Sequence, residues 1–250
     1  MEKSDPKQVI LVTGGARGIG RGIVTRLANK DRVIVINYRD SIAISDEVVK
    51  EIESMGGHAV GIQADVTDAA AVEEMAKNVA QNWGRIDAIV HNASASVTHS
   101  RFEDTKWSDF EKHWSVQVKG AFNLAQAFLP ELRKSAGQLV FVLSSFVLQH
   151  PPVQLSSYVT GKYGLMGLAM SLGVELAKSG VRVNMVSPYI TQTEITPEVP
   201  ARAYELWAAS HPMRRLTTVE DTAAVVEFLL SPDSSYINMV NIPITGGIVT

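Results

Sequence analysis

The sequence predicts a doubly wound α/β fold, in which a parallel β-sheet carries helices on both faces. Short apolar runs of strand length alternate along the chain with longer amphipathic stretches of helix length. The apolar runs show little polar–apolar alternation, which is typical of strands buried on both faces. Strands separated by helical stretches indicate β–α–β crossovers and parallel pairing. No Pro-, Gly- or Ser-rich linker and no fixed-period repeat divides the 250 residues, so we expect one domain over residues 1–250.

The expected elements follow one another in a regular order. An apolar run at residues 8–12 leads into a helical pattern at 18–29, and a run at 32–36 leads into a helix at 41–55. A strand at 59–62, a helix at 68–83, a strand at 86–90 and a long helix at 108–133 come next. Strands at 139–143 and 181–186 enclose a helix at 158–178. The proline-rich segment from Ile195 to Pro200 lies between a strand and a helix and is interpreted as a mobile loop.

Composition excludes several classes of protein. Lys and Arg total 23 against 26 Asp and Glu, so the net charge of −3 leaves no basic excess for nucleic acid. There is no cysteine, and hence no disulfide, thiolate metal site or cysteine nucleophile, and the 6 histidines show no metal-ligand spacing. The first residues are charged, and no stretch is apolar enough for a membrane span. We therefore expect a cytoplasmic protein without a metal site.

A glycine-rich segment follows the first expected strand. Residues 13–20, Thr-Gly-Gly-Ala-Arg-Gly-Ile-Gly, also open the first expected helix. Small residues let the backbone approach a pyrophosphate, and the helix N-terminus offers free N–H groups and partial positive charge. A glycine-rich string by itself can be a plain turn, but its place between a strand and a helix favours a dinucleotide site.

The glycine spacing resembles the Thr-Gly-x-x-x-Gly-x-Gly form of the short-chain dehydrogenase/reductase family. The similarity runs through the whole chain, down to Ile244-Thr245-Gly246-Gly247. It implies a single Rossmann-type oxidoreductase domain of about 250 residues, with a mostly parallel seven-stranded sheet. Within the family, the chain resembles NADP-dependent carbonyl reductases and 3-oxoacyl-carrier-protein reductases.

The end of the second expected strand indicates which nicotinamide cofactor binds. A carboxylate there favours the ribose diol of NAD, whereas an arginine favours the 2′-phosphate of NADP. The chain reads Asn37-Tyr38-Arg39, with no acid before Asp40. Arg39 and Arg17 can bracket a phosphate, although both could also be solvated surface charges. We predict NADP(H), with NAD(H) also possible.

The resemblance implies further cofactor contacts. Asp65-Val66 matches the pair that contacts adenine, and His91-Asn92-Ala93-Ser94 stands where the family has Asn-Asn-Ala-Gly. After the sixth strand, Tyr189 replaces a glycine in the segment that contacts the nicotinamide. The expected cofactor-binding residues are Gly14, Arg17, Gly18, Ile19, Gly20, Asn37, Tyr38, Arg39, Asp65, Val66, Asn92, Ala93, Ser94, Tyr158, Lys162, Pro188, Ile190, Thr191 and Thr193.

Three residues resemble the catalytic group of the family. Tyr158 and Lys162 lie four residues apart, on one face of a helix, and Ser145 lies thirteen residues before Tyr158. A tyrosine can give a proton to a carbonyl oxygen, and a nearby ammonium lowers the phenol pKa from near 10. We expect Tyr158 to be the general acid or base, and Lys162 to lower its pKa and hold the nicotinamide ribose. Ser145 is expected to stabilise the substrate oxygen.

A fourth catalytic candidate departs from the family. Relatives have an asparagine in a Val-Asn-x-x-Gly context, where this chain reads Val116-Gln117-Val118-Lys119-Gly120. The family asparagine helps to hold a proton relay behind the lysine, and Gln117 keeps the amide but adds a methylene. The alternative is that this amide merely stabilises a helix bend.

The expected pocket wall is mostly apolar. It comprises Phe146, Leu148, Pro151, Pro152, Val153, Leu155 and Tyr189. This favours a small hydrophobic carbonyl or alcohol substrate, and the resemblance implies a homotetramer. One alternative is a 3-oxoacyl-carrier-protein reductase, for which Arg214 and Arg215 are the clustered basic residues. The other is a non-catalytic NADP(H) sensor or scaffold, suggested by the departures at Gln117, Ser94 and Tyr189.

Overall fold

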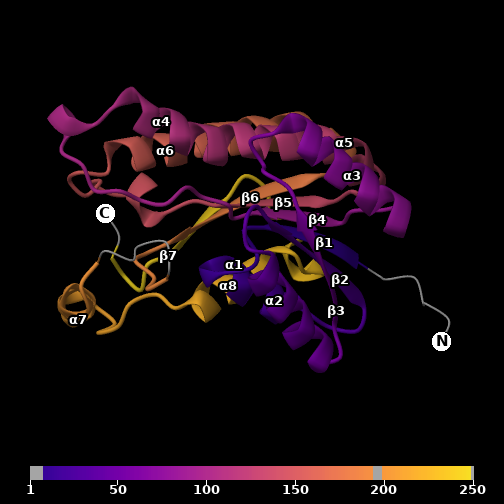
Figure 1. The fold of residues 1–250 in the computed structure, drawn as a ribbon, viewed down its shortest axis with the longest axis horizontal. Coiled ribbons are helices and arrows are strands. Elements are labelled where there is room, and N and C mark those ends of the chain that lie inside the picture. The colour runs from indigo at the N-terminus through magenta and orange to yellow at the C-terminus, as the bar shows by residue number, and fades with distance from the viewer. Residues whose placement is uncertain (1–7, 194–198, 249–250) are drawn as a thin grey trace.

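The described residues, 8–193 and 199–248, form a seven-stranded sheet between two layers of helices in a computed structural model (Figure 1). The strand order is β3-β2-β1-β4-β5-β6-β7, and every neighbouring pair is parallel. The predicted doubly wound α/β fold is therefore confirmed. Of the expected loop from Ile195 to Pro200, residues 195–198 lie outside the described residues.

The six strands expected from apolar runs are all present, with ends that differ by a few residues. The strands are β1 (Gln8–Thr13), β2 (Arg32–Tyr38), β3 (His58–Gln63), β4 (Ala88–His91), β5 (Gln138–Val142), β6 (Arg182–Pro188) and β7 (Asn241–Ile244). Periodicity did not reveal the seventh strand, β7. It lies at the sheet edge, has only four residues and carries Pro243 between its two isoleucines, so it has no continuous apolar run.

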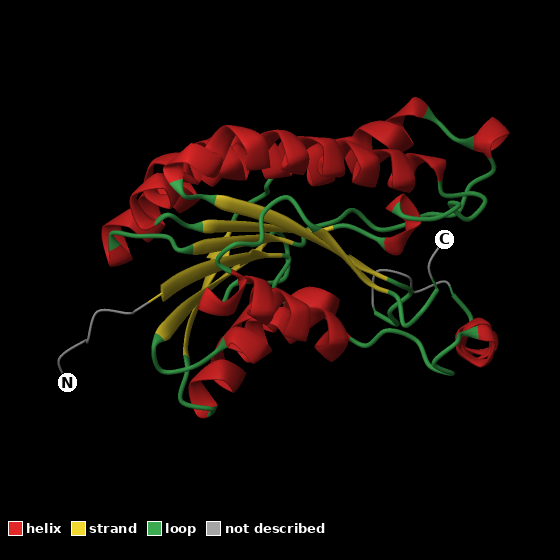
Figure 2. Ribbon diagram, turned by 180° about the vertical axis from the view of Figure 1, so that it is seen from behind, coloured by secondary structure: helices red, strands yellow, loops and turns green. Residues whose placement is uncertain are grey.

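The helices separate into two layers (Figures 1 and 2). One face of the sheet is covered by α3 (Ala69–Trp83), α4 (Trp107–Trp114), α5 (Gly120–Ser135) and α6 (Ser156–Leu176). The other is covered by α1 (Gly18–Leu27), α2 (Ile42–Ser54) and α8 (Val219–Leu229). Helix α7 (Ala201–Ser210) lies beyond β7, away from both layers.

Each layer buries its own apolar core against the sheet. In β1, Val9 and Leu11 pack into the core under α3, α5 and α6, whereas Ile10 and Val12 pack into the core under α1, α2 and α8. Because successive side chains of a strand point to opposite faces, a strand in this position must be apolar at every residue. Double-sided burial thus explains the continuous apolar runs, and it leaves the strand ends as the place for polar groups.

The helix expected over residues 108–133 is interrupted. It consists of α4, a five-residue π turn (η2, Ser115–Lys119) and α5. The amphipathic pattern continues through the interruption, so periodicity could not reveal it. Isolated π turns within helices often occur at functional sites. Here the π turn carries Gln117, whose side chain is completely buried.

Candidate functional site

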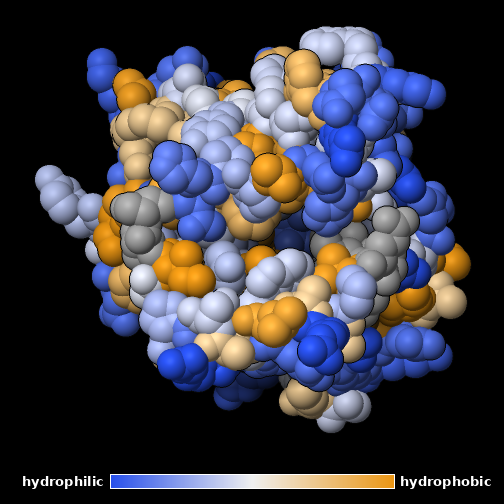
Figure 3. All heavy atoms as spheres, turned by 90° about the vertical axis from the view of Figure 1, so that its left-hand side faces the viewer, coloured by the Kyte–Doolittle hydropathy of each residue, from blue (hydrophilic) through white to orange (hydrophobic). Residues whose placement is uncertain are grey.

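A cleft of about 450 Å³ opens at the carboxyl ends of the strands. The strand order reverses between β1 and β4, and ligands of open α/β sheets bind at such a reversal. Figure 3 views the molecule from the side on which the strands end, and this face is hollowed near its centre. Twelve of the expected cofactor-binding residues line the cleft together: Gly14, Arg17, Gly18, Ile19, Asn37, Tyr38, Arg39, Asp65, Val66, Asn92, Ala93 and Ser94.

The glycine-rich loop between β1 and α1 is held by close packing. Gly14 and Gly18 have positive φ angles of 62° and 49°, which disfavour residues with a side chain. A Cβ on Gly20 would lie 2.1 Å from the Gly14 carbonyl oxygen. Gly20 therefore packs directly against the loop and does not line the cleft. The Asn92 side-chain amide donates to the carbonyl oxygens of Thr13 and Gly14, both at 3.2 Å.

The opposite end of the cleft carries charge. The Asn37 amide donates to the Ala64 carbonyl oxygen at 2.9 Å and so holds the end of β2 against the segment after β3. Beyond it, the Arg39 Nε donates to Asp40 at 2.6 Å, and both side chains are mostly exposed. Arg17 is exposed in the facing glycine-rich loop.

These features fit a dinucleotide. Glycines that leave backbone N–H groups accessible at the start of α1 suit a pyrophosphate. The two arginines at the adenosine end suit an additional phosphate.

The expected catalytic residues lie between α6 and the end of β5. Tyr158 is partly buried and Lys162 is 3% exposed, in the first turns of α6. The Lys162 ammonium donates to the Val142 carbonyl oxygen at 2.7 Å and lies 5.8 Å from the centroid of the Tyr158 ring. Ser145 follows β5 and accepts a hydrogen bond from the Gln149 side chain at 3.3 Å.

The pKa of Tyr158 departs from the sequence expectation. Burial raises it to about 12, and hydrogen bonding by the Ser144 side chain opposes the increase. Burial also lowers the pKa of Lys162 to about 7. The phenol pKa is thus raised, where the sequence led us to expect a lowered value, because desolvation favours the neutral form of both groups.

Two neighbours of Tyr158, Ser144 and His113, were not predicted from the sequence. Ser144, which is nearly buried, is the serine whose side chain influences the phenol pKa. His113 is 3% exposed, and its ring meets that of Tyr158 edge-on at 5.6 Å between centroids. Burial, with a smaller effect of Lys112, lowers the pKa of His113 to about 4. The Ser144-Ser145 doublet was the available signal for the first residue, whereas nothing in the helical pattern pointed to His113.

The residues expected at the nicotinamide end lie apart from the 450 Å³ cleft. Pro188 ends β6, and Ile190, Thr191 and Thr193 follow it. Tyr189, between them, donates its backbone N–H to the Ile244 carbonyl oxygen at 3.1 Å, and its ring lies 5.5 Å from that of His211. This segment is thus held by β7 and by the loop after α7.

His91 links the glycine-rich loop to the π turn. The Thr13 hydroxyl oxygen accepts hydrogen bonds from the backbone N–H groups of Asn92 and Ala93, each at 3.1 Å. Its own proton is then free to be donated to His91 Nδ1, 3.1 Å away. A neutral His91 therefore carries its proton on Nε2 and donates it to the Gln117 carbonyl oxygen at 3.1 Å. Burial, followed by the charge of Lys162, lowers the pKa of His91 to about 3, so the ring stays neutral.

The Gln117 side chain reaches toward the cleft. Its amide nitrogen donates to the Ser94 hydroxyl oxygen at 3.3 Å, and Ser94 donates to the Ala95 carbonyl oxygen at 3.2 Å. The structure thus brings Gln117 together with one expected cofactor-binding residue.

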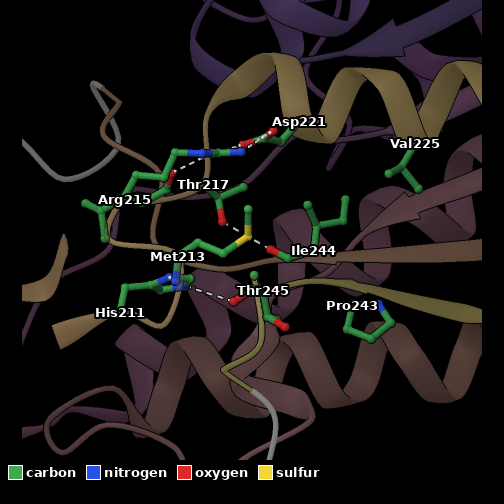
Figure 4. A pocket seen from close by; sticks show the side chains of 11 residues that line it. His211, Met213, Arg215, Thr217, Asp221, Val225, Pro243, Ile244 and Thr245 are labelled. Atoms are coloured by element: carbon green, nitrogen blue, oxygen red, sulfur yellow. Dashed lines mark hydrogen bonds and ion pairs between the residues drawn. The ribbon is translucent and has the colours of Figure 1, made fainter. Parts of the chain in front are cut away.

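A second cleft, of about 320 Å³, lies between the loop after α7, α8 and β7 (Figure 4). Its polar side chains bond to other parts of the protein. Arg215 forms two hydrogen bonds with Asp221, at 2.5 and 3.0 Å, and His211 and Thr217 bond to the carbonyl oxygens of Thr245 and Ile244. These pairings leave the first cleft as the better candidate for a polar ligand.

Within residues 8–193 and 199–248, no group of three or more His, Cys, Asp or Glu side chains is arranged to hold a metal ion. Nor is any of their helices both long enough and apolar enough to cross a membrane.

Comparison with known proteins gives consistent matches over nearly the whole chain. A family described as enoyl-(acyl carrier protein) reductase matches residues 14–249. The 3-oxoacyl-[acyl-carrier-protein] reductase of Staphylococcus aureus is 33% identical over 239 residues, which cover 95% of this chain and 96% of that protein. The enzyme of the same name from Thermotoga maritima is 32% identical and covers 97% and 98%.

Solved structures agree with these matches. A short-chain dehydrogenase from Burkholderia cenocepacia in complex with NADP has a TM-score of 0.89 and 31% identity, and covers 97% of this chain and 98% of its own. A 3-ketoacyl-(acyl-carrier-protein) reductase from Brucella melitensis, complexed with NADH, has a TM-score of 0.88 and 26% identity, and covers 98% and 99%.

The buried histidines predict a loss of stability in acid. A histidine with a lowered folded pKa binds its proton more tightly in the unfolded chain, so the free energy of unfolding falls as pH decreases below 6.5 toward the folded value. For His91, with a pKa near 3, the expected loss is about 2 kcal/mol by pH 5. Urea unfolding at pH 7.5, 6 and 5 should show a smaller loss for His91→Asn than for the wild type. His58→Asn, which changes an exposed histidine, is the control; equal slopes in all three proteins would contradict the assignment.

Proposed function

The chain belongs to the short-chain dehydrogenase/reductase family of oxidoreductases, and from this premise we propose that it transfers hydride from NADPH to a hydrophobic ketone while Tyr158 donates the proton. The observation that carries the proposal is one juxtaposition. On α6, Tyr158 meets Ser144 and Lys162 donates to the Val142 carbonyl oxygen of β5. Gln117 lies between α6 and a cleft suited to a dinucleotide.

Residues of the first cleft would hold the cofactor, which supplies the hydride when bound. The backbone at Gly14 and Gly18 and the N-terminus of α1 would bind the pyrophosphate. Arg17 and Arg39 would bind the 2′-phosphate of NADPH. Asp65, Val66 and the segment from Asn92 to Ser94 would flank the adenosine, and the segment from Pro188 to Thr193 would lie at the nicotinamide.

Carbonyl reduction requires a protonated Tyr158. With its pKa raised to about 12, Tyr158 keeps its proton at neutral pH, which is the form that a proton donor needs. The hydroxyl groups of Ser144 and Ser145 would hold the substrate oxygen, on which charge develops as the carbon accepts hydride. Lys162, with a pKa near 7, would return a proton to the phenolate after transfer and bind the nicotinamide ribose.

The segment after β5 supports a hydrophobic substrate. Val153 is 83% exposed, and Phe146 and Leu148 are partly buried, so these apolar side chains are available to a ligand. Leu155 differs, because it is 4% exposed and belongs to the protein interior.

A 3-oxoacyl thioester on an acidic carrier protein is the second candidate substrate. Two relatives with that activity in their names, 33% and 32% identical, favour it. Of the two arginines offered for carrier binding, Arg215 is already paired with Asp221 in the second cleft. This pairing makes Arg215 a weaker docking residue and favours a small ketone.

We propose a homotetramer as well, supported by apolar side chains on the outer layer of helices. Trp107, Trp114, Phe122, Tyr163, Met170 and Val174 are all exposed on α4, α5 and α6. Exposed apolar groups of this size commonly mark a protein–protein interface. Light scattering of the purified protein should give the mass of four chains, and Val174→Asp should reduce it; a monomeric wild type would contradict the proposal.

The role of Tyr158 is tested by its phenylalanine variant. NADPH oxidation should be followed with simple ketones, diketones and 3-oxoacyl thioesters. Loss of a positioned general acid lowers the rate by about 10²–10⁴-fold, so Tyr158→Phe should reduce kcat by this factor and leave NADPH affinity unchanged. Tyr236→Phe, which changes a fully exposed phenol, is the control. A variant that retains a tenth of wild-type kcat would remove Tyr158 from the proposed role.

Cofactor preference is tested at Arg39. A hydrogen bond to a charged group contributes about 1.5–3 kcal/mol, so Arg39→Ala should raise the KM for NADPH by about 10- to 100-fold. The KM for NADH should change less than about twofold, since that cofactor lacks the 2′-phosphate. Arg26→Ala, on α1 and paired with Glu227, is the matched control. Equal increases for both cofactors would show that Arg39 does not read the phosphate.

A further inference from the structure

Gln117 lies between the catalytic helix and the cofactor cleft. Its side chain is completely buried in the π turn, and its amide nitrogen reaches the Ser94 hydroxyl on the cleft wall. The side-chain oxygen of the same amide, Oε1, faces α6 and has no hydrogen-bond partner among the described residues. A buried unpaired oxygen is unfavourable, so close packing must hold the amide in this place.

That packing comes from Gly161 in α6. A Cβ on Gly161 would lie 2.4 Å from Gln117 Oε1 and 3.2 Å from Gln117 Cδ. Real side chains do not approach so closely, hence Gln117 fills the space that a side chain at residue 161 would need. Another glycine of the same helix, Gly167, has no described atom within 4 Å of its Cβ position. Gly164 and Gly173 of α6 are also closely packed, against Trp114 and Met239, so what distinguishes Gly161 is that its close neighbour is the Gln117 amide.

The backbone of Gln117 is also held. His91 donates its Nε2 proton to the backbone carbonyl oxygen of Gln117. Gln117 is thus held at three points: its backbone, its side-chain nitrogen on Ser94, and its side-chain oxygen packed against Gly161. His91, Ser94 and Gln117 are three of the residues at which the chain departs from the motifs of its family. The structure brings these departures into one cluster, which indicates that they depend on one another.

We propose that Gln117 and Gly161 form a fitted pair that positions the Tyr158–Lys162 turn against the cofactor cleft, which makes Gly161 a positioning residue for carbonyl reduction. The inference rests on the proposed function. Gly161 immediately precedes Lys162, and Ser94 lines the cleft, so the Gln117 amide bridges the two parts of the site. The extra methylene of glutamine, relative to asparagine, is accommodated because Gly161 lacks a methyl group.

A double-mutant cycle tests the fit. Gly161→Ala should push the amide away and shift the catalytic turn, and a misplacement of about 1 Å can lower the rate by roughly 100-fold. We expect kcat to fall about 10- to 100-fold, with the dissociation constant for NADPH, measured by fluorescence, changed less than about threefold. Gln117→Asn alone should also lower kcat, because the shorter side chain cannot span the gap. The double variant Gln117→Asn/Gly161→Ala restores the summed volume and should recover at least about tenfold in kcat over Gly161→Ala, since volume-conserving changes are tolerated best.

Two further variants keep the outcome interpretable. Gly167→Ala is the matched control on α6 and should leave kcat unchanged. Gln117→Met fills nearly the same space without an amide, so it should retain the thermal unfolding midpoint and lose kcat. If Gly161→Ala does not fold, the Gln117→Met and Gln117→Asn proteins still give an answer. Wild-type kcat in Gln117→Met, or no recovery in the double variant, would overturn the proposal.

The same series separates this inference from the proposed function. A wild-type protein without Tyr158-dependent turnover on any carbonyl would defeat the proposed function. The unfolding midpoints of the two single variants and of the double variant would still report whether Gln117 and Gly161 are coupled. Additive midpoints would then overturn the fitted pair as well.

Discussion

The hydrogen-bonded line from Thr13 through His91 to the Gln117 carbonyl is the interaction on which the rest of the site depends. It connects the start of the glycine-rich loop, the end of β4 and the π turn in the helix beside α6. Every residue in it is buried, and a buried donor or acceptor without a partner lowers the free energy of unfolding. Each hydrogen bond of the line therefore stabilises this region. A neutral His91 ring with its proton on Nε2 accepts from the Thr13 hydroxyl at Nδ1 and donates to the backbone carbonyl oxygen of Gln117. The cofactor loop and the catalytic helices thus share one rigid support.

Burial on both faces of the sheet explains where the chemistry lies. The side chains that the strands present to the two cores are mostly apolar, and many polar groups gather at the carboxyl ends of the strands. The same burial determines the protonation of Tyr158 and Lys162. Desolvation raises the pKa of the phenol to about 12 and lowers that of the amine to about 7, so both shifts favour the uncharged forms.

The sequence predicted the fold well because double-sided burial leaves a clear pattern. Six strands appeared as apolar runs, whereas β7 did not, since it has only four residues and its two isoleucines are separated by Pro243. The motif residues from Gly14 to Ser94 were correctly placed in one cleft, because local loops at neighbouring strand ends position them. The π turn, His113 and the contact between Gln117 and Gly161 could not be predicted. They depend on how helices pack at the level of single atoms, and this packing leaves no periodic signal in the sequence.

The exposed rim at Arg39 and the buried packing around Gln117 differ in how well they tolerate amino-acid substitutions. Arg39 and Asp40 form their ion pair at the exposed rim, where water and salt weaken charge interactions. Asp40 also sets a negative charge beside the arginine that would bind the 2′-phosphate, so the discrimination between NADPH and NADH is graded. Around Gln117, in contrast, a change of one methyl group creates a contact that no rearrangement of solvent can relieve. Single substitutions at the rim can thus change cofactor preference, whereas the proposed Gln117–Gly161 pair ties a change at one of its residues to a change at the other.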